Sequence, residues 1–311
     1  AVVSIGPIVY PALLRAGYAK GFSVGLILAA STLAMMIPPG VAMILYSVQT
    51  GASIASVFLA GLSAGLLFVL AISLYSYTYA VRHQIGSNAW AGWKALGRRF
   101  ARSTWALGLP IIIFGGIYGG IFTPTEAAAT ACVYAALVEV LIYRQLRPFE
   151  LLKISQPSAI MIATLLILIS AGSTMTWYLT LERVPAQIAM VLSLVPLEGV
   201  LAMINVVFLL AGMFIDPNSA IIVLAPLIQP AAMAVGLDPV HLGAVLVFNL
   251  AIGMITPPFG LNIFIGITTF RISYLEVVRS VLPFIVIGLI CLLLITYIPQ
   301  LTTWLPQVIR G

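Results

Sequence analysis

Long apolar runs alternate with short polar segments along the whole chain of 311 residues. A run of about twenty apolar residues is long enough to cross a bilayer as an α-helix. Five uninterrupted runs meet this condition, at residues 57–81, 104–122, 125–143, 158–178 and 281–305. The pattern therefore predicts an all-α polytopic membrane protein.

Four other apolar stretches are interrupted. The runs at 21–50 and 240–270 are long enough to cross the membrane, and each contains a Pro-Pro pair. The segments 1–16 and 200–235 are broken by turn-forming residues and are predicted to be parts of re-entrant hairpins. At these four places the sequence departs from simple membrane-crossing helices.

Composition and charge agree with this assignment. Hydrophobic residues make up 62% of the chain and charged residues 7%, whereas about a quarter of an average soluble domain is charged. This excludes a soluble enzyme, a nucleic-acid-binding protein, a disordered protein and a secreted disulfide-stabilised domain. Most Lys and Arg residues fall in or beside the segments 17–20, 82–103, 144–157 and 271–280, which the positive-inside rule places in the cytoplasm.

The first fifty residues align without a gap on residues 220–269, at a constant offset of 219. Prolines and glycines match in register: Pro7 with Pro226, Pro11 with Pro230, Gly17 with Gly236, and Pro38-Pro39 with Pro257-Pro258. Five predicted crossings separate the Gly17 turn from the Gly236 turn, so the two copies should have opposite orientations. Inverted repeats that contain broken helices are typical of secondary transporters.

The repeat also predicts a further segment. Residues 104–219 lead into the second copy, and no counterpart of them precedes the first copy. We therefore expect the chain to be the C-terminal three-quarters of a longer protein, with about 110 further residues at its N-terminus.

The two Pro-Pro pairs should leave backbone carbonyls without partners, because proline has no N–H group. The affected carbonyls are those of Ala34 and Met35 before the first pair, and those of Gly253 and Met254 before the second. A desolvated monovalent cation suits such carbonyls, and the N–H groups of the following half-helix suit an anionic substrate. Side-chain oxygens near the breaks are those of Ser31, Thr32, Asn249, Thr256 and Asn262. The alternative is a proline kink that neighbouring Ser or Thr side chains repair.

The stretch from Gly212 to Ser219 interrupts an apolar run just before the second copy. It is predicted to be a hairpin tip, with Asp216 as N-cap and Pro217 at the first position of the next helix. The Asp216 carboxylate would also lie at membrane depth, where it could face a cation. Asn218 and Ser219 could add oxygen ligands.

A second N-cap signal is Thr123-Pro-Thr-Glu126, a capping box with proline at the first helical position. It explains Glu126 as a structural residue. The sequence contains no Ser-His-Asp, Cys-His, HExxH or phosphate-loop pattern, so no catalytic residue, organic cofactor or transition metal is expected.

Four stretches together resemble the large membrane subunit of tripartite ATP-independent periplasmic (TRAP) transporters, in the right order and spacing along the whole chain. They are Gly119–Ala129 (GGIFTPTEAAA), Ile37–Gly40 (IPPG), Ala211–Pro217 (AGMFIDP) and Asn249–Pro258 (NLAIGMITPP). The resemblance implies a sodium-driven importer of the bacterial inner membrane, in which a transport domain slides against a scaffold as an elevator. It also implies two partners. These are a small four-helix membrane subunit and a periplasmic binding protein that delivers carboxylates such as C4-dicarboxylates, keto acids or sialic acids.

On this resemblance the sodium sites fall at Ser31 with the loop Ile37–Gly40, and at Asp216–Ser219 with the loop Ile255–Pro258. Together with the reasoning from the helix breaks, the predicted cation-binding residues are Ser31, Thr32, Ala34, Met35, Ile37, Pro38, Pro39, Gly40, Asp216, Asn218, Ser219, Asn249, Gly253, Met254, Thr256, Pro257 and Pro258. The predicted substrate-binding residues are Gly40 and Asn262. The family commonly has Ser where Gly40 stands, which removes a side-chain ligand. The tip of the first hairpin would lie just before Ala1, so this stretch alone is not expected to transport.

The expected division is into transport-domain segments at 1–50 and 196–270, a scaffold helix with a loop at 51–103, scaffold helices with an arm at 104–195, and an arm with the last scaffold helix at 271–311.

The main alternative function is a stand-alone sodium- or proton-coupled carrier of carboxylates or ions, without a binding protein. An intramembrane enzyme is disfavoured because no catalytic pair shares a membrane depth. A channel is disfavoured because the helix breaks are expected to form closed ion pockets.

Overall fold

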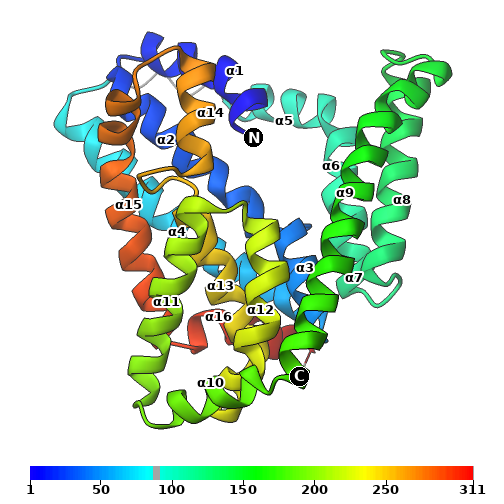
Figure 1. Ribbon diagram of the computed structural model, residues 1–311. Helices are drawn as coiled ribbons and strands as arrows, with labels where there is room; N and C mark the ends of the chain where they lie inside the picture. The colour runs from blue at the N-terminus through cyan, green and yellow to red at the C-terminus, as the bar shows by residue number, and fades with distance from the viewer. Residues whose placement is uncertain (87–91, 311) are drawn as a thin grey trace. The chain divides into compact units, whose positions relative to one another are not determined.

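The structure is a computed structural model that describes residues 1–86 and 92–310, and the regular elements in these ranges are helices (Figure 1). The first copy of the repeat forms α1 (Val2–Arg15), α2 (Lys20–Thr32), α3 (Val41–Thr50) and α4 (Ile54–Arg82). The second copy forms α12 (Pro217–Ala234), α13 (Pro239–Gly253), α14 (Leu261–Phe270) and α15 (Tyr274–Tyr297). The other helices are α5 (Trp93–Arg102), α6 (Thr104–Pro110), α7 (Gly116–Tyr118), α8 (Pro124–Leu137), α9 (Pro148–Leu181), α10 (Val184–Ser193), α11 (Leu197–Phe214) and α16 (Gln300–Arg310).

Within the described ranges, 6 helices are long and apolar enough to cross a membrane, and the all-α polytopic fold class is confirmed. Three expected spans have different limits. The run 104–122 is helical only over Thr104–Tyr118 and is not among these 6 helices. The run 158–178 lies inside the longer α9. The run 281–305 is two helices, because Pro299 disfavours helical backbone at the residue before it. Ile298 accordingly has φ −121° and ψ 80°, and α15 ends at Tyr297.

The two copies of the repeat match helix by helix. α1 ends at Arg15 and α12 ends at Ala234, its equivalent at the offset of 219. Equivalent glycines follow, with φ of +96° at Gly17 and +90° at Gly236, where a side chain would be strained. Links of the same length join α3 to α4 and α14 to α15. The repeat seen in fifty residues of sequence is therefore a repeat of four helices.

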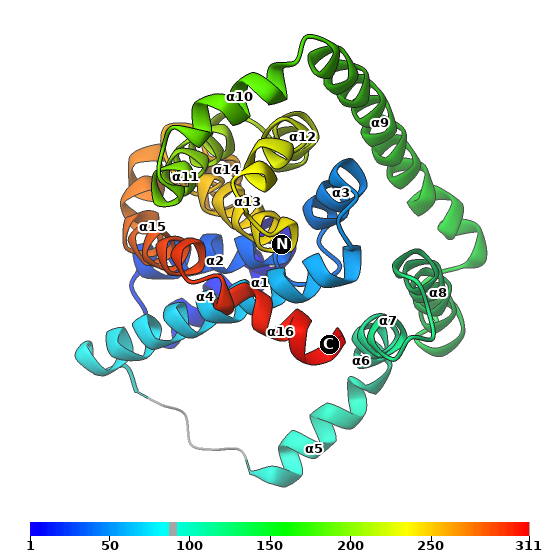
Figure 2. The same ribbon diagram turned by 90° about the horizontal axis from the view of Figure 1, so that it is seen from below.

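The copies also pack on each other reciprocally. α1 packs on α14 while α12 packs on α3, and α2 packs on α15 while α13 packs on α4. Figure 1 shows α1 and α14 side by side near the top of the view, with α12 and α3 lower. In Figure 2, α13 lies between α11 and α4, and its residues from His241 to Gly253 are all buried. An exchange of contacts of this kind is what a two-fold relation between repeats produces.

Packing divides the chain into two compact units, residues 1–86 with 171–311, and residues 87–170. The first unit contains both copies of the repeat. It includes α4 and α15, which lie in segments that the sequence assigns to the scaffold. The division into a moving domain and a fixed scaffold stays a prediction.

Two glycines allow α11 and α13 to approach closely. A Cβ atom at Gly253 would lie 2.6 Å from the backbone of Gly212, closer than real side chains come. Small residues bring helix backbones together in this way in membrane proteins. Beside this contact, the N–H of Gly260 donates to the carbonyl of Met213 at 3.0 Å. The end of α11 is thus joined to the second broken loop.

Replacing Gly253 with alanine should lower the thermal unfolding temperature of the purified protein. The added methyl group forces α11 and α13 apart, and overpacking of this kind costs about 1–3 kcal/mol. Gly97→Ala is the matched control, because a Cβ at this helical glycine meets nothing within 4 Å. Equal unfolding temperatures for the two variants would contradict the proposed glycine contact.

Candidate functional site

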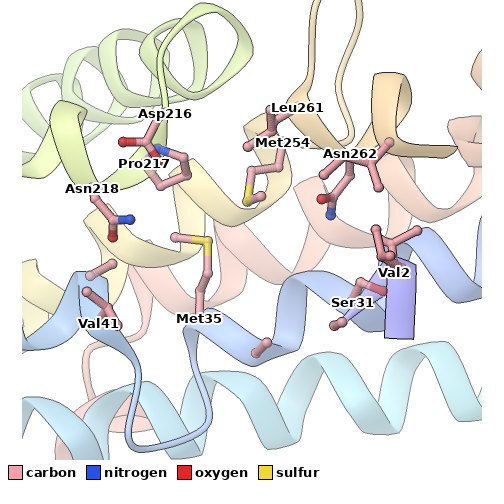
Figure 3. A pocket seen from close by; sticks show the side chains of 15 residues that line it. Val2, Ser31, Met35, Val41, Asp216, Pro217, Asn218, Met254, Leu261 and Asn262 are labelled. Atoms are coloured by element: carbon pink, nitrogen blue, oxygen red, sulfur yellow. The ribbon is translucent and has the colours of Figure 1, made fainter. Parts of the chain in front are cut away.

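A cavity of about 340 Å³ lies where the two broken helices meet the start of α12 (Figure 3). Its walls come from the first residues of α1, the end of α2 with the 3₁₀ turn Leu33–Met35 that follows it, and the starts of α3, α12 and α14, together with the residue after α13. Seven residues predicted to bind a cation or substrate line it: Ser31, Ala34, Met35, Asp216, Asn218, Met254 and Asn262. Folding therefore brings parts of both predicted sites to one cavity.

Asp216 caps α12 and faces the cavity. Its Oδ2 accepts hydrogen bonds from the backbone N–H and the hydroxyl of Ser219, both at 2.9 Å. The predicted N-cap is therefore confirmed. Asp216 is also the only ionisable side chain among the residues that line this cavity. Ser219 itself is not a lining residue.

The backbone carbonyls differ between the two breaks. Within the described residues, the carbonyls of Ala34 and Met35 accept no hydrogen bond, as expected for the first break. At the second break the expectation of unpartnered carbonyls is wrong. The carbonyl of Gly253 accepts from the N–H of Thr256 at 3.0 Å, and that of Met254 accepts from the N–H of Asn262 at 2.9 Å. One N–H group from the loop and one from the first turn of α14 thus replace those that proline lacks, and each carbonyl keeps a second lone pair.

Three of the predicted hydroxyl ligands donate to backbone carbonyls three or four residues earlier in the chain, Ser31 and Thr32 within α2, and Thr256 from the second loop back to α13. Ser31 donates to the carbonyl of Ile27 at 2.7 Å, Thr32 to that of Ala29 at 2.8 Å, and Thr256 to that of Ile252 at 2.7 Å. These bonds are the common way in which Ser and Thr are satisfied inside apolar helices. Only Ser31 among the three lines the cavity.

Both Pro-Pro loops lie outside the cavity lining. A Cβ atom at Gly40 would overlap the carbonyl of Met35. The first loop folds back closely onto that carbonyl, which explains why glycine stands at this position. In the second loop, the Tyr274 hydroxyl donates to the carbonyl of Pro258 at 2.7 Å. The peptide bonds Pro38-Pro39 and Pro257-Pro258 are both cis.

Asn249 takes part in a buried network that connects three helices. Its Nδ2 donates to Oδ1 of Asn205 on α11 at 2.8 Å, and Nδ2 of Asn205 donates to the Thr296 hydroxyl on α15 at 3.1 Å. All three residues are buried, and none lines the cavity. Sequence reasoning missed Asn205 and Thr296. The signal available was a single amide inside the otherwise apolar run that forms α11.

Asn262 lies in the first turn of α14 and is 4% exposed. Its Nδ2 is buried and has no hydrogen-bond partner among the described residues. Figure 3 shows this amide at the cavity, across from Asp216 and Asn218. The side chains of Met35 and Met254, equivalent in the repeat, extend into the cavity from opposite sides. The sequence paired these two methionines but did not predict a role for their thioethers.

A helical membrane protein whose repeats each supply a broken helix to one shared polar cavity has the architecture of a secondary transporter. Comparison with known proteins identifies the family. The family model for the DctM component of tripartite ATP-independent periplasmic transporters matches residues 1–301. The chain therefore belongs to the DctM family of TRAP transporter large permease proteins.

Individual relatives agree with this assignment. The chain is 39% identical over 306 residues to an ectoine/5-hydroxyectoine TRAP transporter large permease protein of Ruegeria pomeroyi, covering 98% of this chain and 72% of the relative. It is 36% identical over 332 residues to a C4-dicarboxylate TRAP transporter large permease protein of Vibrio cholerae, covering 100% and 73%. A 2,3-diketo-L-gulonate TRAP transporter large permease protein of Escherichia coli is 30% identical over 302 residues, covering 96% and 71%.

Family membership establishes the general role of the protein. It is a transporter subunit of the inner membrane and not an enzyme. TRAP large permeases work with a small membrane subunit and a periplasmic binding protein. In one relative, the isethionate TRAP transporter permease protein of Oleidesulfovibrio alaskensis, the name combines the two membrane subunits.

Two substitutions separate the charge of Asp216 from its capping role. In sodium-free potassium buffer, Asp216→Ala should lower the free energy of unfolding by about 1 kcal/mol, because the cap of α12 is lost. Asp216→Asn should lower it by only a few tenths of a kcal/mol, because asparagine caps about as well as aspartate. The measurement is chemical or thermal unfolding of the purified protein. If asparagine destabilised as much as alanine, the carboxylate would have a structural role beyond capping.

Proposed function

We propose that this large permease subunit couples import of small organic acids to sodium, and that the cavity of Figure 3 holds the coupling ion. One observation carries the proposal. The Asp216 carboxylate lines the same cavity as Ala34 and Met35, whose carbonyls accept no hydrogen bond from the described residues. A carboxylate and unpaired carbonyls that line one cavity offer a cation several oxygen ligands.

The donor atoms favour a hard monovalent cation. The polar atoms offered by the lining residues include the Asp216 carboxylate, the Asn218 amide, the Ser31 hydroxyl and backbone carbonyls, and oxygen ligands suit hard cations. No group of three or more His, Cys, Asp or Glu residues that could hold a metal ion occurs in the described part of the chain. We propose that Thr32, Asn249 and Thr256 support this site from behind its lining.

The substrate should bind at the start of α14. The buried Nδ2 of Asn262 is a free donor there, and the N-terminal end of a helix favours an anionic group. Apolar side chains of Val2, Val41, Leu261 and Ile265 line the rest of the cavity and suit the carbon skeleton of a small acid. The relatives are named for several different substrates, so the proposal concerns a class of compounds.

We further propose that a small four-helix subunit braces the scaffold, that a periplasmic binding protein delivers the substrate, and that the unit holding both repeats moves as an elevator. The support is the family's tripartite organisation and the compact packing of both repeats in one unit. The candidate substrates are of C4-dicarboxylate, keto acid or sialic acid type.

Uptake into proteoliposomes tests the proposal. The full-length subunit, with its small partner, would be supplied with labelled organic acids under an inward sodium gradient, with and without the binding protein. We expect uptake to need both the sodium gradient and the binding protein. Asp216→Asn should reduce uptake at least tenfold through loss of the ion ligand. Asp238→Asn is the matched control. Asp238 is also an N-cap, on α13, but it does not line the cavity.

Each other result has a definite meaning. Uptake that is independent of sodium would contradict the proposed ion site. Sodium-driven uptake without the binding protein would favour a stand-alone carrier. Equal losses in Asp216→Asn and Asp238→Asn would contradict a specific role for the charge in the cavity.

A further inference from the structure

A second cavity, of about 260 Å³, lies between α2, α4 and α15. Four aromatic rings form its walls: Phe22, Tyr75, Tyr79 and Phe284. Phe22 stacks on Tyr79 with ring centroids 3.9 Å apart, and Tyr75 meets Phe284 edge-to-face at 5.3 Å. These contacts hold the walls in place. None of the residues predicted to bind sodium or substrate lines this cavity.

One cation stands at this cavity without a counter-ion. Arg279 lines the cavity and is exposed, and no described acidic side chain forms an ion pair with it. The nearest acid in sequence is Glu276. Its carboxylate is held at the start of α15 by the backbone N–H and the hydroxyl of Ser273, both at 2.9 Å, and it interacts electrostatically with Lys20. The guanidinium of Arg279 is therefore left to bind an external anion.

The position of the cavity fits the membrane interface. Lys20, Arg82 and Arg279 all lie in or beside segments that the positive-inside rule places at the cytoplasmic surface. Tyrosine side chains are enriched at this depth. In addition, α2 begins at the cavity wall, and no side chain caps its first turn, so its N–H groups add partial positive charge.

An apolar strip continues from Arg279 along α15. Leu282 and Val286 follow at i+3 and i+7 and are 48% and 55% exposed, so they share one face of the helix with Arg279. A soluble anion would use the guanidinium alone. A phospholipid would use the guanidinium for its phosphate, the aromatic walls for its glycerol region, and the exposed strip for an acyl chain.

We propose that this cavity binds the headgroup of an anionic phospholipid of the cytoplasmic leaflet, with its phosphate at Arg279. Basic pockets between membrane helices on the cytoplasmic side bind anionic headgroups in this way. Because the cavity is shared by α2, α4 and α15, one lipid contacts helices from both copies of the repeat. The site is independent of the proposed sodium and substrate chemistry.

Native mass spectrometry of the full-length protein with its membrane partner tests this site. Phosphatidylglycerol is the probe, and phosphatidylcholine and inorganic phosphate are the comparison ligands. Arg279→Gln should weaken phosphatidylglycerol binding about tenfold, the loss expected for a charge-assisted contact to phosphate. Arg271→Gln is the matched control, because it removes the same charge from the same predicted surface but outside the cavity. It should change the affinity for phosphatidylglycerol less than twofold.

The outcomes are separable. Unchanged phosphatidylglycerol binding in Arg279→Gln, or equal affinity for phosphatidylcholine, would overturn the proposal. Inorganic phosphate that displaces the lipid, with the same dependence on Arg279, would show a site for soluble anions and would overturn the lipid assignment. If Arg279→Gln does not fold, Leu282→Gln decides the question. It should weaken phosphatidylglycerol binding about threefold by removing apolar contact, and unchanged binding would overturn the proposal.

Discussion

Backbone polar groups at membrane depth must find partners within the protein, and this requirement organises the region around the two Pro-Pro pairs. The two copies of the repeat meet it differently. At the second break, the loop supplies an N–H group to the carbonyl of Gly253, and the first turn of α14 supplies one to the carbonyl of Met254. At the first break, the carbonyls of Ala34 and Met35 accept no hydrogen bond from the described residues. The repeat is therefore symmetric in its helices and asymmetric in its polar groups, and Asp216 adds to this asymmetry.

The reciprocal packing of the two copies explains how one cavity collects groups from distant parts of the sequence. α12 packs on α3, and α11 is held to α13 through Gly212 and Gly253. These contacts place the start of α12 beside the first break as well as the second. The buried Asn205–Asn249–Thr296 network ties α13 to α11 and α15. A buried network of this kind constrains the helices that carry the site, because each broken bond would leave an unsatisfied polar group.

Much of this arrangement could be predicted from the sequence, because proline, glycine and capping residues act locally. The helix breaks, the capping box at Thr123 and Glu126, and the N-cap at Asp216 are of this kind. What the sequence could not show depends on contacts between distant segments. The bond from Asn262 to the carbonyl of Met254 and the partnership of Asn249 with Asn205 both require the folded chain. Asn249, a predicted cation ligand, lies outside the cavity lining for the same reason.

We propose that the cavity at the two breaks holds a sodium ion through Asp216. Equilibrium binding of radioactive sodium to the purified protein tests it most directly, without substrate or partner proteins. We expect saturable binding that unlabelled sodium displaces and potassium does not. Asp216→Asn should weaken this binding at least tenfold. Absence of saturable binding, or binding that Asp216→Asn leaves unchanged, would contradict it.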